Sequence, residues 1–169
     1  MRDNTDDGRE SREEATKDED RSITVNRVIE ATPERVYEAF VDADELAAWL
    51  PPEGFSCEVH EFNATEGGTF RMSFTADIKE LEPYAHTFHG TYEELSPGER
   101  IVYTEEFESN DPGMAGEMTT TVTFKKIAGG TEVTAHQAGI PENIPPQDAN
   151  EGWNDSLGNL ADVVEEGSA

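Results

Sequence analysis

The sequence is poor in cysteine and in long apolar runs, and each shortage excludes a class of protein. Cys57 is the only cysteine among the 169 residues, so no internal disulfide can form. No stretch approaches the roughly 18 apolar residues of a membrane span, and no hydrophobic segment near Met1 resembles a signal peptide. We therefore expect a cytoplasmic protein. Motifs such as G-x-S-x-G, a phosphate loop or a dinucleotide fingerprint are also missing.

Positive charge is scarce: 12 Lys and Arg stand against 38 Asp and Glu, and only four of the basic residues are lysines. The formal net charge of -26 repels phosphate, which argues against nucleic acids and anionic membranes as partners. An acidic surface poor in lysine stays hydrated in concentrated salt, where the Debye length is about 3 Å at 1 M. We interpret the charge as a halophilic adaptation to a saline cytoplasm.

The first 21 residues contain one methionine, one alanine and no other apolar residue. Such a segment cannot bury enough surface to offset the entropy of ordering it. We therefore expect a disordered acidic tail over residues 1–21 and one folded domain over residues 22–169.

The folded part begins with a strand and two short helices. "SITVNRVIEA" alternates Ile23, Val25 and then Val28 with polar residues, which predicts a strand. In "ATPERVYEAFVDADELAAWLPP", Thr32 is a suitable N-cap for a first helix and Asp44 for a second, and the double proline ends the second helix. The first helix has an apolar stripe at helical spacing, made of Val36, Ala39 and Phe40.

From Phe55 onward, short alternating runs are separated by tight turns, which predicts an antiparallel sheet. Phe88, Gly90 and Tyr92 share one strand face, as do Ile101, Tyr103 and Glu105. The chain closes with an amphipathic helix that needs the sheet as its partner surface, because its apolar stripe is narrow and continuous: Trp153, Leu157, Leu160 and Val164. The order of elements predicts an α+β fold in which the sheet curls around the last helix.

Several motifs occur in an order that carries a family resemblance. After "ATPERVYEAFVDADELAAWLPP" come "GGTFR", "HGTYEEL", "PGERIVYTE", "GGTEVT" and "GW…L..L", which together with the first strand span residues 23–165. The chain resembles the SRPBCC superfamily, also called START-like or helix-grip. Within it, the chain looks like homologues of the C-terminal domain of the heat-shock protein 90 ATPase activator. The resemblance implies a curved antiparallel sheet wrapped around a long C-terminal helix, with two short helices after the first strand.

Two departures limit what this resemblance implies about activity. Many relatives have a His six residues after the threonine of "GGT", whereas this chain has Gln137 there, with His136 beside it. We also expect that the protein lacks the separate N-terminal domain of the chaperone activator, so chaperone ATPase activation is not expected from the resemblance alone.

The resemblance further implies a cavity between the sheet and the last helix. We expect ten residues to bind a ligand there: Trp49, Phe70, Met72, Phe74, Phe88, Tyr92, Tyr103, Glu105, Gln137 and Trp153. Trp49 is expected at the rim, where the second short helix meets the opening, while Tyr37 and Phe40 are expected in the core.

Glu105 has two interpretations. If its strand face points inward, Glu105 is a buried carboxyl with a raised pKa and a candidate acid-base group. In the opposite register it is one more surface acid. We expect no metal, since His86 and His89 face opposite sides of one strand, and no cofactor. Cys57 is expected to be a small buried thiol, because His60 lies on the other face of its strand.

Three functions remain open. The first is a protein that binds a small apolar or amphipathic molecule, and it has no catalytic residues. The second is an enzyme of the polyketide cyclase or hydrolase type that uses Tyr103, Glu105 or Gln137. The third is a co-chaperone-like interaction module, which would have a filled cavity and an exposed apolar patch. The oligomeric state and the ligand are not predicted.

Overall fold

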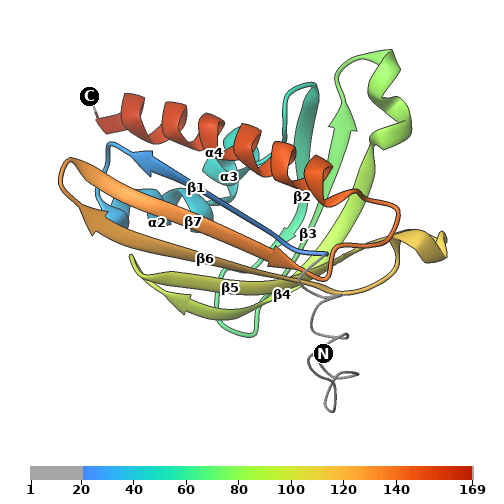
Figure 1. Cartoon of the computed structure of the whole chain (residues 1–169), viewed down its shortest axis with the longest axis horizontal. Coiled ribbons are helices and arrows are strands. Elements are labelled where there is room, and N and C mark those ends of the chain that lie inside the picture. The colour runs from blue at the N-terminus through green and yellow to red at the C-terminus, as the bar shows by residue number, and fades with distance from the viewer. Residues whose placement is uncertain (1–20, 169) are drawn as a thin grey trace, which may run out of the picture.

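The computed structural model describes residues 21–168, with side chains up to Glu165, as one curved sheet with helices on its concave side (Figure 1). The expected tail covers residues 1–21, of which residues 1–20 lie outside the described part. The seven strands are β1 (Ile23–Ile29), β2 (Phe55–Phe62), β3 (Thr69–Ala76), β4 (His86–Ser96), β5 (Arg100–Phe107), β6 (Met118–Ile127) and β7 (Gly130–Ala138).

The strands are antiparallel throughout and follow the order β1-β7-β6-β5-β4-β3-β2. Each of the strands β2 to β6 pairs with the next strand in the chain, which confirms the run of hairpin-spaced strands expected from the sequence. The pairing of β1 with β7 is the long-range contact that brings the first strand beside the last.

The helices lie on one face of this sheet. They are α2 (Pro33–Val41), α3 (Ala43–Trp49) and the long α4 (Pro146–Ser168), accompanied by the short 3₁₀ helices η1 (Lys79–Tyr84) and η2 (Pro112–Met114). Figure 1 shows α4 crossing the sheet, with α3 beside it. The predicted α+β helix-grip architecture is confirmed. Among the described residues, no helix is long and apolar enough to cross a bilayer.

Side-chain caps set the bounds of the two short helices. The Thr32 side chain accepts a hydrogen bond from the Arg35 N–H at 3.1 Å, as expected of an N-cap. The cap predicted for the second helix is wrong: Asp42, not Asp44, accepts from the Glu45 N–H at 3.0 Å. Because Asp42 alone separates α2 from α3, it ends one helix and begins the next.

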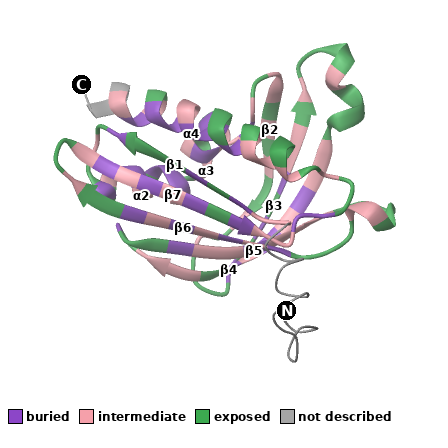
Figure 2. Cartoon of the chain, in the orientation of Figure 1, coloured by how far each residue is buried: buried purple, intermediate pink, exposed green. Residues whose placement is uncertain are grey.

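Burial alternates along the strands, and the buried side of α4 faces the sheet (Figure 2). In β1, Val28 is 53% exposed, and Ile29 takes the interior position. Ile29 has the same parity as Ile23 and Val25, so the pleat turns it to the core. The predicted core stripe of α4 is confirmed, since its four members are buried: Trp153, Leu157, Leu160 and Val164.

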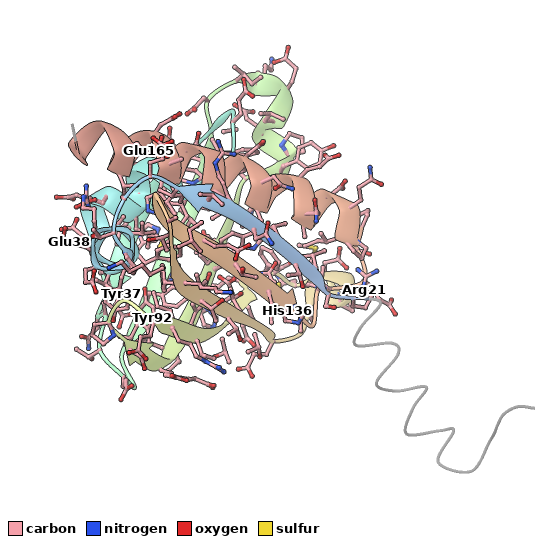
Figure 3. All side chains as sticks on the ribbon, turned by 60° about the vertical axis from the view of Figure 1, so that its left-hand side comes forward. Arg21, Tyr37, Glu38, Tyr92, His136 and Glu165 are labelled. Atoms are coloured by element: carbon pink, nitrogen blue, oxygen red, sulfur yellow. The ribbon has the colours of Figure 1, made fainter. Side chains whose placement is uncertain are left out.

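Arg21 joins the start of β1 to the loop between β7 and α4 (Figure 3). Its Nε donates to the Ile140 carbonyl at 3.0 Å, and its Nη2 donates to the carbonyls of Pro141 and Ile144. The Ile140 N–H in turn donates to the Arg21 carbonyl at 3.0 Å. The residue that we assigned to the end of the tail is therefore tied to the loop that leads into α4.

Candidate functional site

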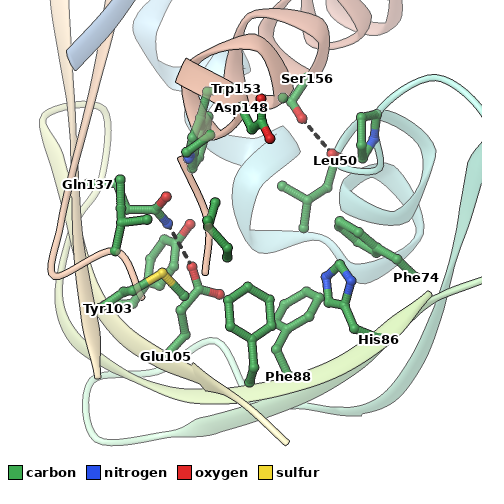
Figure 4. A pocket seen from close by; sticks show the side chains of 17 residues that line it. Leu50, Phe74, His86, Phe88, Tyr103, Glu105, Gln137, Asp148, Trp153 and Ser156 are labelled. Carbon is green, nitrogen blue, oxygen red and sulfur yellow. Dashed lines mark hydrogen bonds between the residues drawn. The ribbon is translucent and has the colours of Figure 1, made fainter. Parts of the chain in front are cut away.

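A cavity of about 210 Å³ lies between the concave face of the sheet and the first half of α4 (Figure 4). Strands β3 to β7 form its floor, the end of α3 and the β7–α4 loop form its sides, and α4 covers it. Six of the ten residues expected at a ligand site line it: Phe74, Phe88, Tyr103, Glu105, Gln137 and Trp153.

A row of polar side chains crosses the floor of this cavity. The sheet register places Tyr103 opposite Thr120, and Thr120 opposite Gln137, on three adjacent strands. The Gln137 Nε2 donates to Thr120 Oγ1 and to Glu105 Oε2, each at 3.1 Å. Thr120 is fully buried and also hydrogen-bonds to Tyr103. These bonds fix the Glu105 carboxyl against the sheet.

Glu105 faces inward, as the first of its two interpretations expects. Burial raises its pKa to about 7, and the hydrogen bond from Gln137 opposes this by favouring the carboxylate. The side chain is half-buried, and its remaining surface faces the cavity. Near neutral pH, the site therefore holds a carboxyl that is present in both its acid and its base form.

His86 is a cavity residue that we did not select from the sequence. Its ring packs against Phe107, Phe74 and Phe88, with centroid distances of 5.0, 5.3 and 5.8 Å. Its Nδ1 donates to the Tyr84 carbonyl at 2.9 Å, so Nε2 is the unprotonated nitrogen of the neutral ring. Burial lowers its pKa. The signal was present, because His86 lies two residues before Phe88 and so shares its strand face.

Further lining comes from segments without a periodic pattern. The β7–α4 loop contributes Ile140 and Ile144, and the exposed Asp148 lies at the mouth. Ser156 of α4 donates to the Leu50 carbonyl at 2.5 Å, which ties α4 to the end of α3 beside the cavity. Sequence patterns place residues on helix and strand faces, so the loop residues Ile140 and Ile144 gave no signal.

The other four expected site residues surround a second, smaller space of about 20 Å³, room for roughly one water molecule. They are Trp49, Phe70, Met72 and Tyr92. All four are almost completely buried. This part of the interior is packed protein core that adjoins the cavity.

The rim position expected for Trp49 is wrong. Its side chain is 0% exposed, and its indole N–H donates to the Ala39 carbonyl at 2.9 Å. Its ring lies edge-on to Phe40 at a centroid distance of 4.6 Å. Trp49 sits on the face of α3 that turns toward α2 and the sheet, so it joins Phe40 in the core.

The remaining candidates offer no second reactive centre. Burial raises the pKa of Cys57 to about 11, which suppresses the thiolate. His60 bonds to Ser73 at 2.8 Å on the exposed side. His136 is exposed and bonds to Thr24 at 2.8 Å (Figure 3), so it takes no part in the cavity. Within residues 21–165, no group of three or more His, Cys, Asp or Glu side chains is placed to hold a metal.

An antiparallel sheet curled around a C-terminal helix, with a cavity between the two, defines the helix-grip class. Residues 30–165 match the family model described as activator of Hsp90 ATPase homolog 1-like protein. The chain belongs to this family, which confirms the resemblance stated from the motifs.

Solved structures support the same class. A crystal structure of a protein from Chromobacterium violaceum is 46% identical, with a TM-score of 0.79 over 86% of this chain and 97% of that one. A solution structure of a protein from Arthrobacter aurescens shares 16% identity, with a TM-score of 0.74 over 88% of both chains. A crystal structure of a Rhodobacter sphaeroides protein shares 20% identity, with a TM-score of 0.70 over 86% and 92% of the two chains. No curated protein matches this chain significantly.

Proposed function

We propose that this protein binds a small apolar or amphipathic molecule in the cavity between the sheet and α4. The single observation that carries the proposal is a cavity of about 210 Å³ whose walls are largely apolar, with Glu105 and Gln137 converging on its floor. An engineered cavity of about 150 Å³ holds benzene, so a ligand with one or two rings is the expected size. The cytoplasm remains our predicted location.

A glycine in the cavity wall provides a direct test. A Cβ at Gly152 would meet nothing within 4 Å, so a side chain placed there has open space to fill. Gly158 lies on the same helix but does not line the cavity, and a Cβ there meets only Arg27 Nη1 at 3.8 Å. Gly152→Leu therefore fills the cavity, and Gly158→Leu makes the same chemical change elsewhere on the helix.

The experiment is a thermal-shift screen of the full chain in molar KCl against small aromatic amphiphiles of one or two rings, with lipids, sterols and aromatic polyketides as larger members of the library. A ligand at about 100 times its Kd adds ~2.7 kcal/mol to the free energy of unfolding, which raises the melting midpoint. Hits should be lost in Gly152→Leu and kept in Gly158→Leu. No shift across the library, or hits that survive Gly152→Leu, would overturn the proposal.

A second candidate function is a cyclase or hydrolase reaction in the same cavity. The pKa of about 7 of Glu105 favours it, because a general base works best with a pKa near the working pH. Glu105→Gln would then keep the affinity for a screened hit and lose its turnover. The interaction-module hypothesis has less support, since it expects a filled cavity.

A further inference from the structure

The hydrogen-bonding capacity left open in the cavity consists mostly of acceptors. The donors of three lining side chains are spent inside the protein: Gln137 Nε2 on Glu105 and Thr120, Ser156 Oγ on Leu50, and His86 Nδ1 on Tyr84. Within the part of the chain that the structure describes, no group donates a hydrogen bond to Glu105 Oε1, Gln137 Oε1 or His86 Nε2. The donors that remain are the Trp153 indole and the Tyr103 hydroxyl, and the latter is hydrogen-bonded to Thr120.

The charges on the lining have one sign. Of the described residues that form the wall, Glu105 and Asp148 are acidic, and none is Lys or Arg. His86 adds no charge at neutral pH because burial lowers its pKa. The net charge of -26 also gives the whole molecule a field that attracts cations. An anionic ligand would meet repulsion on approach and in the cavity.

Aromatic rings surround this negative site. Phe74, Phe88 and Phe107 line the cavity around His86, and Tyr103 and Trp153 line it around the Glu105–Gln137 pair (Figure 4). The faces of aromatic rings attract organic cations, most strongly where water is excluded. An inorganic cation such as Ca²⁺ prefers six to eight oxygen ligands, which a wall made largely of carbon does not supply.

We propose that the ligand of this cavity is a small organic ammonium compound, with its nitrogen at the carboxylate of Glu105 and its apolar part among the aromatic rings. The proposal rests on the proposed binding function and names the ligand class for it. The ammonium N–H groups donate to Glu105 and to Gln137 Oε1. This pairing also supplies a counter-charge for the half-buried carboxylate, which no Lys or Arg of the described cavity wall provides.

The proposed ion pair with Glu105 makes the affinity for the ammonium depend on pH. A bound cation favours the carboxylate, so binding to the protonated form of Glu105, whose pKa is about 7 in the free protein, must release a proton. Affinity should fall about tenfold per pH unit below 7 and stay level from pH 7.5 to 8.5, where an alkylammonium keeps its charge. The other titratable groups around the cavity are Tyr92 and Tyr103, whose raised pKa values keep them neutral, together with His86 and Asp148.

The test compares three probes that share a phenylethyl group: 2-phenylethylammonium, 2-phenylethanol and 3-phenylpropanoate. Calorimetric Kd values are measured with the full chain at pH 8 and constant ionic strength. We expect the ammonium to bind at least about tenfold more tightly than the alcohol, and the carboxylate to bind most weakly. At pH 6 the ammonium should lose about tenfold in affinity, while the alcohol should change little.

Two neighbouring substitutions on β5 test whether Glu105 causes the preference for the ammonium over the alcohol. Glu105→Gln keeps the shape of the side chain and should reduce the ammonium-to-alcohol preference to within about threefold, because the ammonium loses its counter-charge. Glu106→Gln removes a charge from the opposite face of the strand, where the side chain is 47% exposed, and should leave the preference unchanged. Circular dichroism melts verify that both variants fold.

The outcomes separate this inference from the proposed function. Tighter binding of the alcohol or of the carboxylate, or a preference that survives Glu105→Gln, would overturn the ammonium assignment and leave a binding cavity. Failure of all three probes to bind at millimolar concentration would overturn the assignment. The Gly152→Leu screen then decides separately whether the cavity binds anything.

Discussion

The two faces of the sheet at β4 and β5 hold their carboxylates in opposite environments. On the inner face, Glu105 lies opposite Gly90 and Met118 and receives one side-chain hydrogen bond, from Gln137. On the outer face, Arg71, His89 and Glu106 form a row across three strands, and Glu108 follows directly after β5.

On this outer face, the negative charge of Glu108 is balanced by hydrogen bonds from neighbouring side chains. Arg71 donates to both of its oxygens, at 2.8 and 3.0 Å, and His89 Nδ1 lies 2.9 Å from Oε2. The hydrogen bonds from Arg71 and His89 lower the pKa of Glu108 to about 2. On the inner face, burial raises the pKa of Glu105 to about 7. Two acids three residues apart thus differ because one meets a guanidinium in water and the other meets an apolar cavity.

The difference indicates which face carries a cost to folding. The outer carboxylate is in its favoured charged form at neutral pH and stabilises the fold. Above pH 7 the Glu105 carboxyl is charged, although its buried surroundings favour the neutral form. The charged group therefore lowers the stability of the fold. Strongly raised pKa values of this kind cluster at functional sites, which supports the cavity as the place of activity.

The largest expected effect comes from truncating a ring packed on the inner side. Trp49→Ala should lower the free energy of unfolding by about 3–5 kcal/mol, since it removes a fully buried ring and leaves a cavity. Chemical denaturation of the full chain measures this loss. Tyr84→Ala is the matched control, because that ring is 65% exposed and should change stability by less than about 0.5 kcal/mol. A loss below about 1 kcal/mol for Trp49→Ala would contradict the core position.

The next effect concerns the inner carboxyl itself. The pKa of Glu105 rises from its ordinary value near 4.5 to about 7 in the folded protein. The folded state therefore loses stability as the pH rises from 4.5 to 7, and the full cost is present above 7. At about 1.36 kcal/mol per pKa unit this amounts to roughly 3 kcal/mol.

Glu105→Gln should accordingly stabilise the protein by about 2–3 kcal/mol at pH 8 and have little effect at pH 4.5. Denaturation midpoints of the variant and the parent across this range measure the difference. The free energy of unfolding of Glu106→Gln should equal that of the parent at every pH to within about 0.5 kcal/mol. Equal destabilisation by Glu105→Gln at both pH values would mean that hydrogen bonding, not burial, dominates at this position.

Parity alone predicted that Tyr103 and Glu105 share one face of β5, because strand side chains alternate. It left open whether that face points to the interior or to the solvent. The partner of Glu105 did not follow, because Gln137 lies 32 residues further on and reaches it through the register of three strands. Register is set by all the hairpins between them, and no local pattern reports it.

Helix orientation limited the prediction in a similar way. Trp49 was correctly placed on α3, but whether its ring points to the opening or to the core depends on how α3 packs against α2 and the sheet. The family resemblance supplied the general position of the cavity. It gave no information on the loop that closes the cavity, where Ile140 and Ile144 lie.

The smallest expected effect lies on the outer face, at Glu108. Its pKa is lowered to about 2, so the stability it contributes is present above pH 4.5 and is lost as the pH falls toward 2. Glu108→Gln should lower the melting midpoint by on the order of 1–2 °C at pH 7, because exposed ion pairs contribute little, and by less at pH 3. Scanning calorimetry at both pH values measures this. Since the pair is exposed, the effect should shrink further in molar KCl, whereas that of Glu105→Gln should persist. An effect of Glu108→Gln that grows toward acid, or that resists salt, would remove the contrast between the two faces.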